Sequence, residues 1–142
     1  MDSVLSIGEY AFCNCGSLTE IFIPAGIVSI GDSTFFGCSS LTSIFLPDGI
    51  TSIGDRAFSY CYSLTEINIP DGVSCIGKNA FADCDSLSKI VIPDSVNFIG
   101  EGAFNNNNSL TLTVGHDSYA LSYAREYGLH YTYPDSDDWL FQ

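Results

Sequence analysis

The sequence is poor in basic side chains. Its 142 residues include 17 Asp or Glu but only 4 Lys or Arg, which gives a formal net charge of −13. Nucleic acids and anionic membranes attract proteins through clustered Lys and Arg. Four bases spread along the chain cannot form such a cluster, so both classes of partner are excluded. Only 15% of residues are charged, against roughly 25% in an average domain, so the acidity reflects missing bases.

Long apolar runs are also absent. Every apolar stretch is interrupted within a few residues by Pro, Gly or a charge, whereas a membrane-spanning helix needs about 20 apolar residues. The segment that begins Met1-Asp2-Ser3 lacks the basic and apolar regions of a signal peptide. We therefore expect neither a signal peptide nor an anchor in this chain. The apolar content of 46% still suffices for one buried core, which excludes a disordered acidic chain.

What the sequence does contain is a repeat. Ile-Gly pairs begin at positions 7, 30, 53, 76 and 99, each number 23 above the last. A unit of this size cannot bury its own apolar residues, so such units stack into a solenoid. The columns that keep the period are Phe12, Phe35, Phe58, Phe81 and Phe104; Leu18, Leu41, Leu64, Leu87 and Leu110; Ile21, Ile44, Ile67 and Ile90; and Pro24, Pro47, Pro70 and Pro93.

Each unit contains a short strand followed by turns. In residues 18–24, Ile21 and Ile23 alternate with Glu20 and Phe22, a pattern that predicts a strand with the isoleucines facing inward. Pro-Asp-Gly turns follow in two units, and residues 31–35 are typical of a tight helical turn. Stacking aligns the strands into a parallel sheet with a spacing of roughly 4.8 Å.

The repeating unit I-G-x-x-A-F-x-x-C-x-S-L-T-x-I-x-I-P-x-G-[IV]-x-S resembles the BspA-like class of leucine-rich repeats, over about residues 4–114. The resemblance implies an α/β solenoid: a right-handed superhelix with a parallel concave β-sheet and short helical turns. Members are mostly bacterial surface proteins, with some from mucosal protists, and the better-known ones adhere to proteins of a host or neighbouring cell. The resemblance implies a location outside the cell or at its surface, and no enzymatic activity.

The repeats occupy residues 1–115, and the first of the five is incomplete. Counting back one period from Pro24 places Met1 in the proline position, so the first strand is missing and the N-terminal face is uncapped. Solenoids need polar caps at their ends. An open end indicates either a fragment of a longer array or a stacking partner, which makes self-association through this face one hypothesis.

The other end is predicted to carry a helix–strand cap at residues 116–133. Asp117 or Ser118 can cap a helix that Gly128 ends. Residues 129–133 then alternate like an edge strand. An acidic aromatic tail, 134–142, ends in Trp139-Leu140-Phe141 and either docks by its aromatics or leads into a further domain. The predicted buried face of the helix consists of Ala120, Leu121, Ala124 and Tyr127.

Four cysteines share one repeat position. Neighbouring Cα atoms in such a column fall within the disulfide range, but the fifth position holds Asn107, a residue that bonds loop backbone. The position therefore favours a small side chain that hydrogen-bonds to the backbone of the turn. We predict buried, reduced thiols at this position. Ligands in a line cannot surround a tetrahedral metal. The column is Cys15, Cys38, Cys61 and Cys84, and Cys13 and Cys75 lie outside it.

No catalytic, cofactor or metal site is predicted. His116 and His130 lie beyond the repeats without a recognisable catalytic motif, and we expect them to be structural. Gly100-Glu101-Gly102 begins like a dinucleotide-binding motif, but it lacks the third glycine and is explained by the repeat. Asn107-Asn108-Ser109 matches an N-glycosylation sequon, but the repeat places Asn107 at an inward position. Calcium at the acidic turns is a weaker alternative to solvated turn residues. The acidic columns are Glu9, Asp32, Asp55 and Glu101, and Asp48, Asp71 and Asp94.

The outward strand positions are the candidate partner-binding site. Two neighbouring phenylalanines on a sheet face are costly in water and often mark a contact, although cross-strand stacking is an equal alternative. The leading hypothesis is a non-enzymatic protein-interaction or adhesion module, and the alternative is a spacer that presents another domain. The candidate residues are Glu20, Phe22, Ser43, Phe45, Glu66, Asn68, Lys89 and Val91.

Overall fold

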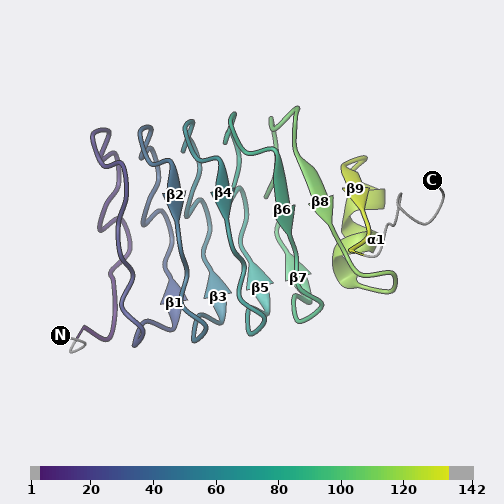
Figure 1. Ribbon diagram of the computed structural model, residues 1–142, viewed down its shortest axis with the longest axis horizontal. Coiled ribbons are helices and arrows are strands. Elements are labelled where there is room, and N and C mark those ends of the chain that lie inside the picture. Colours follow the sequence, from purple (N-terminus) through teal and green to yellow (C-terminus); the bar gives the residue numbers. More distant parts are fainter. Residues whose placement is uncertain (1–3, 135–142) are drawn as a thin grey trace.

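The computed structural model describes residues 4–134, which form a solenoid of stacked coils closed by one helix (Figure 1). We number the coils one to five by their Ile-Gly pairs, from Ile7-Gly8 to Ile99-Gly100. Short strands, all paired in parallel, lie side by side along the solenoid. The predicted parallel solenoid with a C-terminal helix–strand cap is therefore confirmed.

The predicted strand row is present. It consists of β2 (Ser43–Ile44), β4 (Glu66–Ile67), β6 (Lys89–Val91), β8 (Thr111–Thr113) and β9 (His130–Thr132). In coil one the row continues only as a single bridge between Phe22 and Phe45. Further along, Ile90 pairs with Leu112, which lies one position short of a full period, so coil five lacks one residue of the repeat.

A second row of strands was not predicted. Sequence analysis identified only the strand that contains Ile21 and its equivalents, whereas the structure has another parallel sheet earlier in each coil. Its strands carry one buried isoleucine each, and neighbouring strands pair at an offset of one full period. This sheet consists of β1 (Ser29–Ile30), β3 (Ser52–Ile53), β5 (Cys75–Ile76) and β7 (Phe98–Ile99).

The segment at residues 31–35 is not the helical turn that the sequence suggested. Ser33 has a φ of 55°, a left-handed conformation that interrupts any right-handed helix. The N–H groups of Thr34 and Phe36 bond within the coil, to Gly31 and Ser33. Those of Ser33, Phe35 and Gly37 instead bond to the next coil, at 2.8, 2.9 and 2.8 Å. Successive N–H groups therefore alternate between a bond within the turn and a bond to the next coil.

The glycines of the last three Ile-Gly pairs, Gly54, Gly77 and Gly100, are required by this close stacking. A Cβ placed on Gly77 would lie 2.5 Å from the backbone nitrogen of Asp55 and 2.6 Å from the carbonyl carbon of Gly54. Gly100 meets the preceding coil in the same way, with Lys78 N at 2.5 Å. Side chains add a further link, because Oδ1 of Asp32 accepts a hydrogen bond of 2.8 Å from the N–H of Asp55. Oδ1 of Asp55 accepts the equivalent bond of 2.9 Å from the N–H of Lys78, so both carboxylates serve the backbone rather than acting only as solvated turn acids.

A column of phenylalanines forms the centre of the core. Phe12, Phe35, Phe58, Phe81 and Phe104 lie with neighbouring ring centroids 5.3–5.7 Å apart and with rings within 9° of parallel. The three middle rings are completely buried. Because each ring is packed between its neighbours, the coils share one core instead of having separate ones.

The cysteine column is also internal. The thiols of Cys38, Cys61 and Cys84 donate to carbonyl oxygens of the coil before, at 3.0–3.2 Å. The Asn107 amide makes the equivalent bond to Phe81 O at 2.7 Å, as expected for a position that must satisfy the turn. All six cysteines are free, and Cys13, Cys15 and Cys75 are only half-buried. The prediction of reduced, buried thiols therefore holds for three of the four column members.

Helix α1 (Tyr119–Glu126) and β9 form the cap. Ser118 caps the helix by accepting a hydrogen bond of 3.1 Å from Leu121 N, and Gly128 follows its end with a φ of 66°. The predicted buried face was wrong at Tyr127, which is 49% exposed. Tyr123 takes the inward position, where its ring packs on Phe104 and its hydroxyl donates to Gly100 O at 2.7 Å.

The described residues contain no helix of the length and apolarity that a bilayer requires, since α1 has only eight residues. The predicted docking of Trp139, Leu140 and Phe141 concerns residues outside the described range.

The phenylalanine column supplies a test of the shared core. Replacing Phe58 by Ala should lower the free energy of unfolding by about 3–5 kcal/mol, because the cavity would lie between two packed rings. Phe45→Ala, on an exposed ring, is the matched control and should change it by no more than about 0.5 kcal/mol. Urea denaturation followed by circular dichroism measures both. Equal losses for the two variants would contradict the shared core.

The thiols supply a second test. Burial raises the pKa of Cys38 to about 11 and that of Cys84 to about 12, and it raises the pKa of Cys61 as well. Since the thiolate is the reactive form, the native protein at pH 8 should react quickly with Ellman's reagent only at the three half-buried cysteines. In denaturant without reductant all six should react. A denatured count of four or fewer would mean that disulfides form.

Candidate functional site

The candidate site is the strand face formed by the outward positions of β2, β4 and β6. Six of the eight predicted residues line one shallow groove of about 440 Å³, while Glu20 and Phe22 lie on coil one beside it. Buried Ile44, Ile67 and Ile90 alternate with the outward residues, so the alternation predicted from the sequence is what presents them. The six lining residues are Ser43, Phe45, Glu66, Asn68, Lys89 and Val91.

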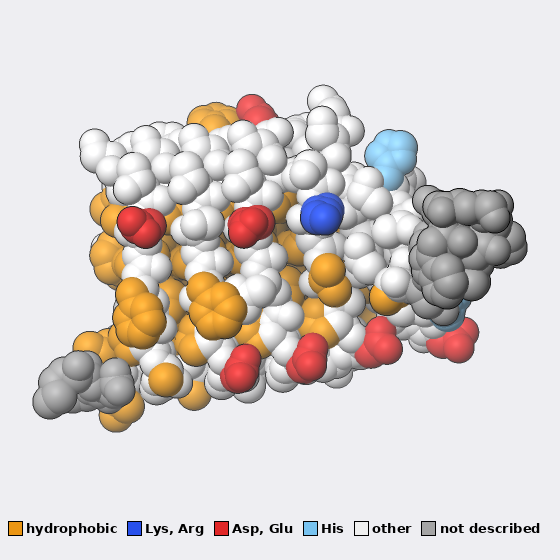
Figure 2. All heavy atoms as spheres, viewed as in Figure 1, with side chains coloured by type: hydrophobic (Ala, Val, Ile, Leu, Met, Phe, Trp, Pro, Cys, Tyr) orange, Lys and Arg blue, Asp and Glu red, His pale blue; other side chains and the backbone are white. Residues whose placement is uncertain are grey.

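Large apolar side chains are exposed on this face. Phe22 is 81% exposed and Phe45 is 69% exposed, and the two lie on neighbouring coils joined by their backbone bridge. Val91 extends the same row two coils further on and is also exposed. Figure 2 shows large hydrophobic side chains standing out from this face. The row is thus an apolar surface fixed on a sheet, with no loop to reorder.

Asn68 makes internal hydrogen bonds that the sequence did not predict. It occupies the coil-three position of the Phe22–Phe45 row, but its Oδ1 accepts from Leu46 N and its Nδ2 donates to Leu46 O, both at 2.9 Å. Its amide therefore replaces a backbone pairing and is only partly available to a partner. The groove lies where this shorter side chain separates Phe45 from Val91.

Acidic side chains flank the apolar row. Glu20 and Glu66 are exposed two residues before the row, with Lys89 at the same position in coil four. Asp48, Asp71 and Asp94 are exposed in the turns that follow it. Figure 2 shows acidic groups on both sides of the hydrophobic ones, with one basic group. A partner on this face would therefore meet apolar groups within a predominantly negative field.

Residues 4–134 contain no group of three or more His, Cys, Asp or Glu placed to hold a metal ion. The histidines lie in the cap, where the His116 ring stacks on Tyr133 at 3.9 Å and His130 is exposed on β9. Gly102 has a φ of 72°, which gives this glycine a turn role that the repeat register anticipated.

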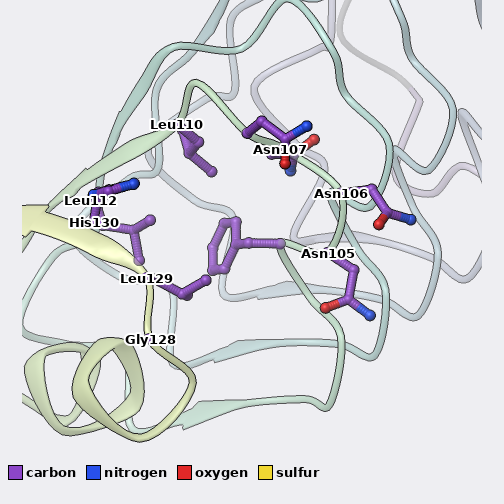
Figure 3. Close-up of a pocket in the computed structure, with 10 residues that line it drawn as sticks. Asn105, Asn106, Asn107, Leu110, Leu112, Gly128, Leu129 and His130 are labelled. Atoms are coloured by element: carbon purple, nitrogen blue, oxygen red, sulfur yellow. The ribbon is translucent and has the colours of Figure 1, made fainter.

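A smaller depression of about 210 Å³ lies between coil five and the cap (Figure 3). Figure 3 shows an aromatic ring at the centre of the depression, with Leu110 and Leu129 on either side of it and the asparagine run along one side. The amide of Asn107 is committed there to Cys84 N and Phe81 O, both at 2.7 Å. This depression lies at the junction of coil five and the cap, where the helix packs in place of a sixth coil.

A second groove, of about 290 Å³, was missed by the sequence analysis. It lies on the turn segments of coils two to five, and we call it the ridge groove. Its edges include Arg56 and Tyr60, both exposed and both with left-handed backbone. A signal was present in the sequence, since the equivalent positions of other coils hold mainly Gly, Asn or Asp and these two do not.

Comparison with family models matches residues 2–122 to the BspA type leucine rich repeat region, in 6 copies. No curated protein matches the chain. Among solved structures, the leucine-rich repeat protein TpLRR of T. pallidum is 38% identical, with a TM-score of 0.75 over 78% of this chain and 52% of that one. A leucine-rich repeat protein from Bacteroides ovatus is 31% identical, with a TM-score of 0.54 over 79% and 38%.

The pneumococcal vaccine antigen PcpA shares the fold, with a TM-score of 0.67 and 24% identity over 80% of this chain and 36% of that one. The chain spans about half the length of the T. pallidum protein and little more than a third of the other two. The repeat, the parallel solenoid and the family model agree, and the chain belongs to the BspA-type leucine-rich repeat family, whose members commonly mediate protein interaction or adhesion and are typically non-enzymatic.

Proposed function

We propose that this chain is a protein-binding or adhesion module that uses the strand face of β2, β4 and β6. The observation that carries the proposal is the pair of exposed rings, Phe22 and Phe45, on neighbouring strands of a rigid sheet. Aromatic side chains on a preformed surface are typical of interface anchors, because little conformational entropy is lost when they are covered. Family membership supports a role at the cell surface or in the secreted fraction.

The charges around the rings define the kind of partner. Glu20 and Glu66 lie before the apolar row and three aspartates lie after it, with Lys89 the one base among the residues that line the groove. A polypeptide segment with an apolar side chain flanked by Lys or Arg would be complementary. Such charges act mainly on the rate of encounter, so the association should slow as salt is added.

The alternative is a spacer whose strand face has no ligand. In that case the two rings would serve only to pack across strands, and their removal would affect stability alone. Replacing both rings distinguishes the two proposals.

We expect Phe22→Ser/Phe45→Ser to abolish partner binding while the protein still unfolds cooperatively. The matched control is Val28→Ser, which removes an exposed apolar side chain of the same region outside the strand face. A photo-crosslinking phenylalanine derivative at position 45, compared with position 28, would identify the partner, and the variants would then be compared by surface plasmon resonance. Unchanged binding by the double variant would rule out the strand face.

The open N-terminal face supports a second interface. Ile7, Phe12, Cys15, Leu18 and Ile21 are only partly buried, whereas their equivalents in coil two are 5% exposed or less. An end surface of this kind is expected to be covered by another coil. We propose that it can stack on a second copy of the chain.

Self-association of this kind predicts a mass that rises with protein concentration in size-exclusion chromatography with light scattering. Leu18→Lys should keep the chain monomeric, because it places a charge in the stacked face. Tyr127→Lys, on the exposed surface of the cap, is the control and should leave the association unchanged. A wild-type chain that stays monomeric at millimolar concentration would contradict the proposal.

A further inference from the structure

The ridge groove is built from three adjacent rows of repeat positions. Ser59 and Ala82 are buried and form its floor, whereas the rims are formed by Arg56 with Asn79 and by Tyr60 with Asp83. In coil two the floor position holds Phe36, whose larger side chain closes one end. The groove therefore exists because two coils carry small residues where a neighbouring coil carries a ring.

Aromatic rings surround the closed end. The Phe36 and Tyr60 rings meet edge to face with centroids 5.3 Å apart, and Tyr62 meets Tyr60 in the same manner at 5.9 Å. Tyr60 is nevertheless 40% exposed. The cluster thus leaves ring surface open to solvent beside the groove.

The backbone makes these side chains costly. Arg56 has a φ of 56° and Tyr60 a φ of 62°, in the left-handed region that costs most residues about 1–2 kcal/mol. Gly and Asn adopt it with less strain, and the equivalents of Tyr60 are Asn14, Gly37, Asp83 and Asn106. Burial does not compensate, because both side chains are exposed. The left-handed backbone recurs at these positions in every coil, at Tyr10 and Ser33 among others, and beside the groove it carries two large exposed side chains.

The polar groups on the rims are available to a ligand. Within residues 4–134 the guanidinium of Arg56 makes no hydrogen bond or ion pair. It offers planar donors, the Asp83 carboxylate offers acceptors, and the asparagine amides of the groove offer both. An anion would be repelled by Asp83 and by the net charge of −13, and a fully apolar ligand would leave the rims unpaired.

We propose that the ridge groove binds a neutral carbohydrate. A pyranose ring has an apolar C–H face, which could pack on the exposed surface of the Tyr60 ring, and a rim of hydroxyls that both donate and accept hydrogen bonds. Arg56, Asn79 and Asp83 supply the matching planar groups. This site is separate from the strand face, and its ligand class is different.

The test uses the whole chain and a panel of neutral hexasaccharides: cello-, malto-, manno- and chitohexaose. Isothermal titration and native affinity electrophoresis in the matching polysaccharides measure binding. We expect saturable, one-to-one binding of at least one member. Absence of binding to all four would overturn the proposal, as would stronger binding of a proline-rich peptide, the other ligand that exposed tyrosines can accept.

Two variants locate the site. Tyr60→Gly should weaken sugar binding about tenfold by removing the stacking surface, yet fold normally, because the coil-two equivalent is already Gly37. Ala82→Phe should block the groove, since coil two holds Phe36 at that position. Phe45→Ser, on the strand face, is the control and should bind sugar like the wild type. Normal sugar binding by both groove variants would overturn the assignment.

Discussion

The structure depends on hydrogen bonds between consecutive coils. In each turn segment alternate N–H groups bond to the next coil, as Ser33 does to Asp55 and Phe35 to Ala57. These bonds form only if the turn segments of neighbouring coils have the same length, so that their carbonyls stay in step. The period of the repeat follows from this, as do the glycines at 54, 77 and 100, where the coils lie too close for a Cβ.

Because the coils stack in register, residues at equivalent repeat positions form straight rows on the surface. One substitution changes one point of a row, while the backbone beneath it stays fixed by the neighbouring coils. Both grooves arise in this way: Asn68 interrupts the apolar row of the strand face, and Ser59 and Ala82 place small side chains at the position where coil two has Phe36. A stacked scaffold can therefore carry binding sites of different chemistry without altering its fold.

The sequence predicted those features that depend on burial. Three such features appear in the sequence as residue types that recur with the repeat period. They are the inward alternation of Ile21 and Ile23, the phenylalanine column, and the small inward group shared by Cys84 and Asn107. The sheet of β1, β3, β5 and β7 shows in the sequence only as the isoleucine of each Ile-Gly pair, and a two-residue strand such as Ser29–Ile30 is too short to show the alternation that identifies a strand.

Other features depend on contacts that one chain segment cannot reveal. Helical periodicity allows either Tyr123 or Tyr127 to face inward, and the Phe104 ring and the Gly100 carbonyl decide for Tyr123. The bond from Asn68 to Leu46 is likewise invisible, because an amide that replaces a backbone pair has no pattern of its own. The left-handed turns were missed because Arg56 and Tyr60 are not residues that usually mark them.

The same stacking explains where the acidity lies. A repeat that placed a carboxylate in every coil would hold like charges about 5 Å apart, at a cost of about 1 kcal/mol per pair even in water. The row of Glu20 and Glu66 avoids this, because Ser43 separates them and Lys89 follows. Asp48, Asp71 and Asp94 are not separated, and all three are exposed. Because the three carboxylates interact through water, salt screens their mutual repulsion.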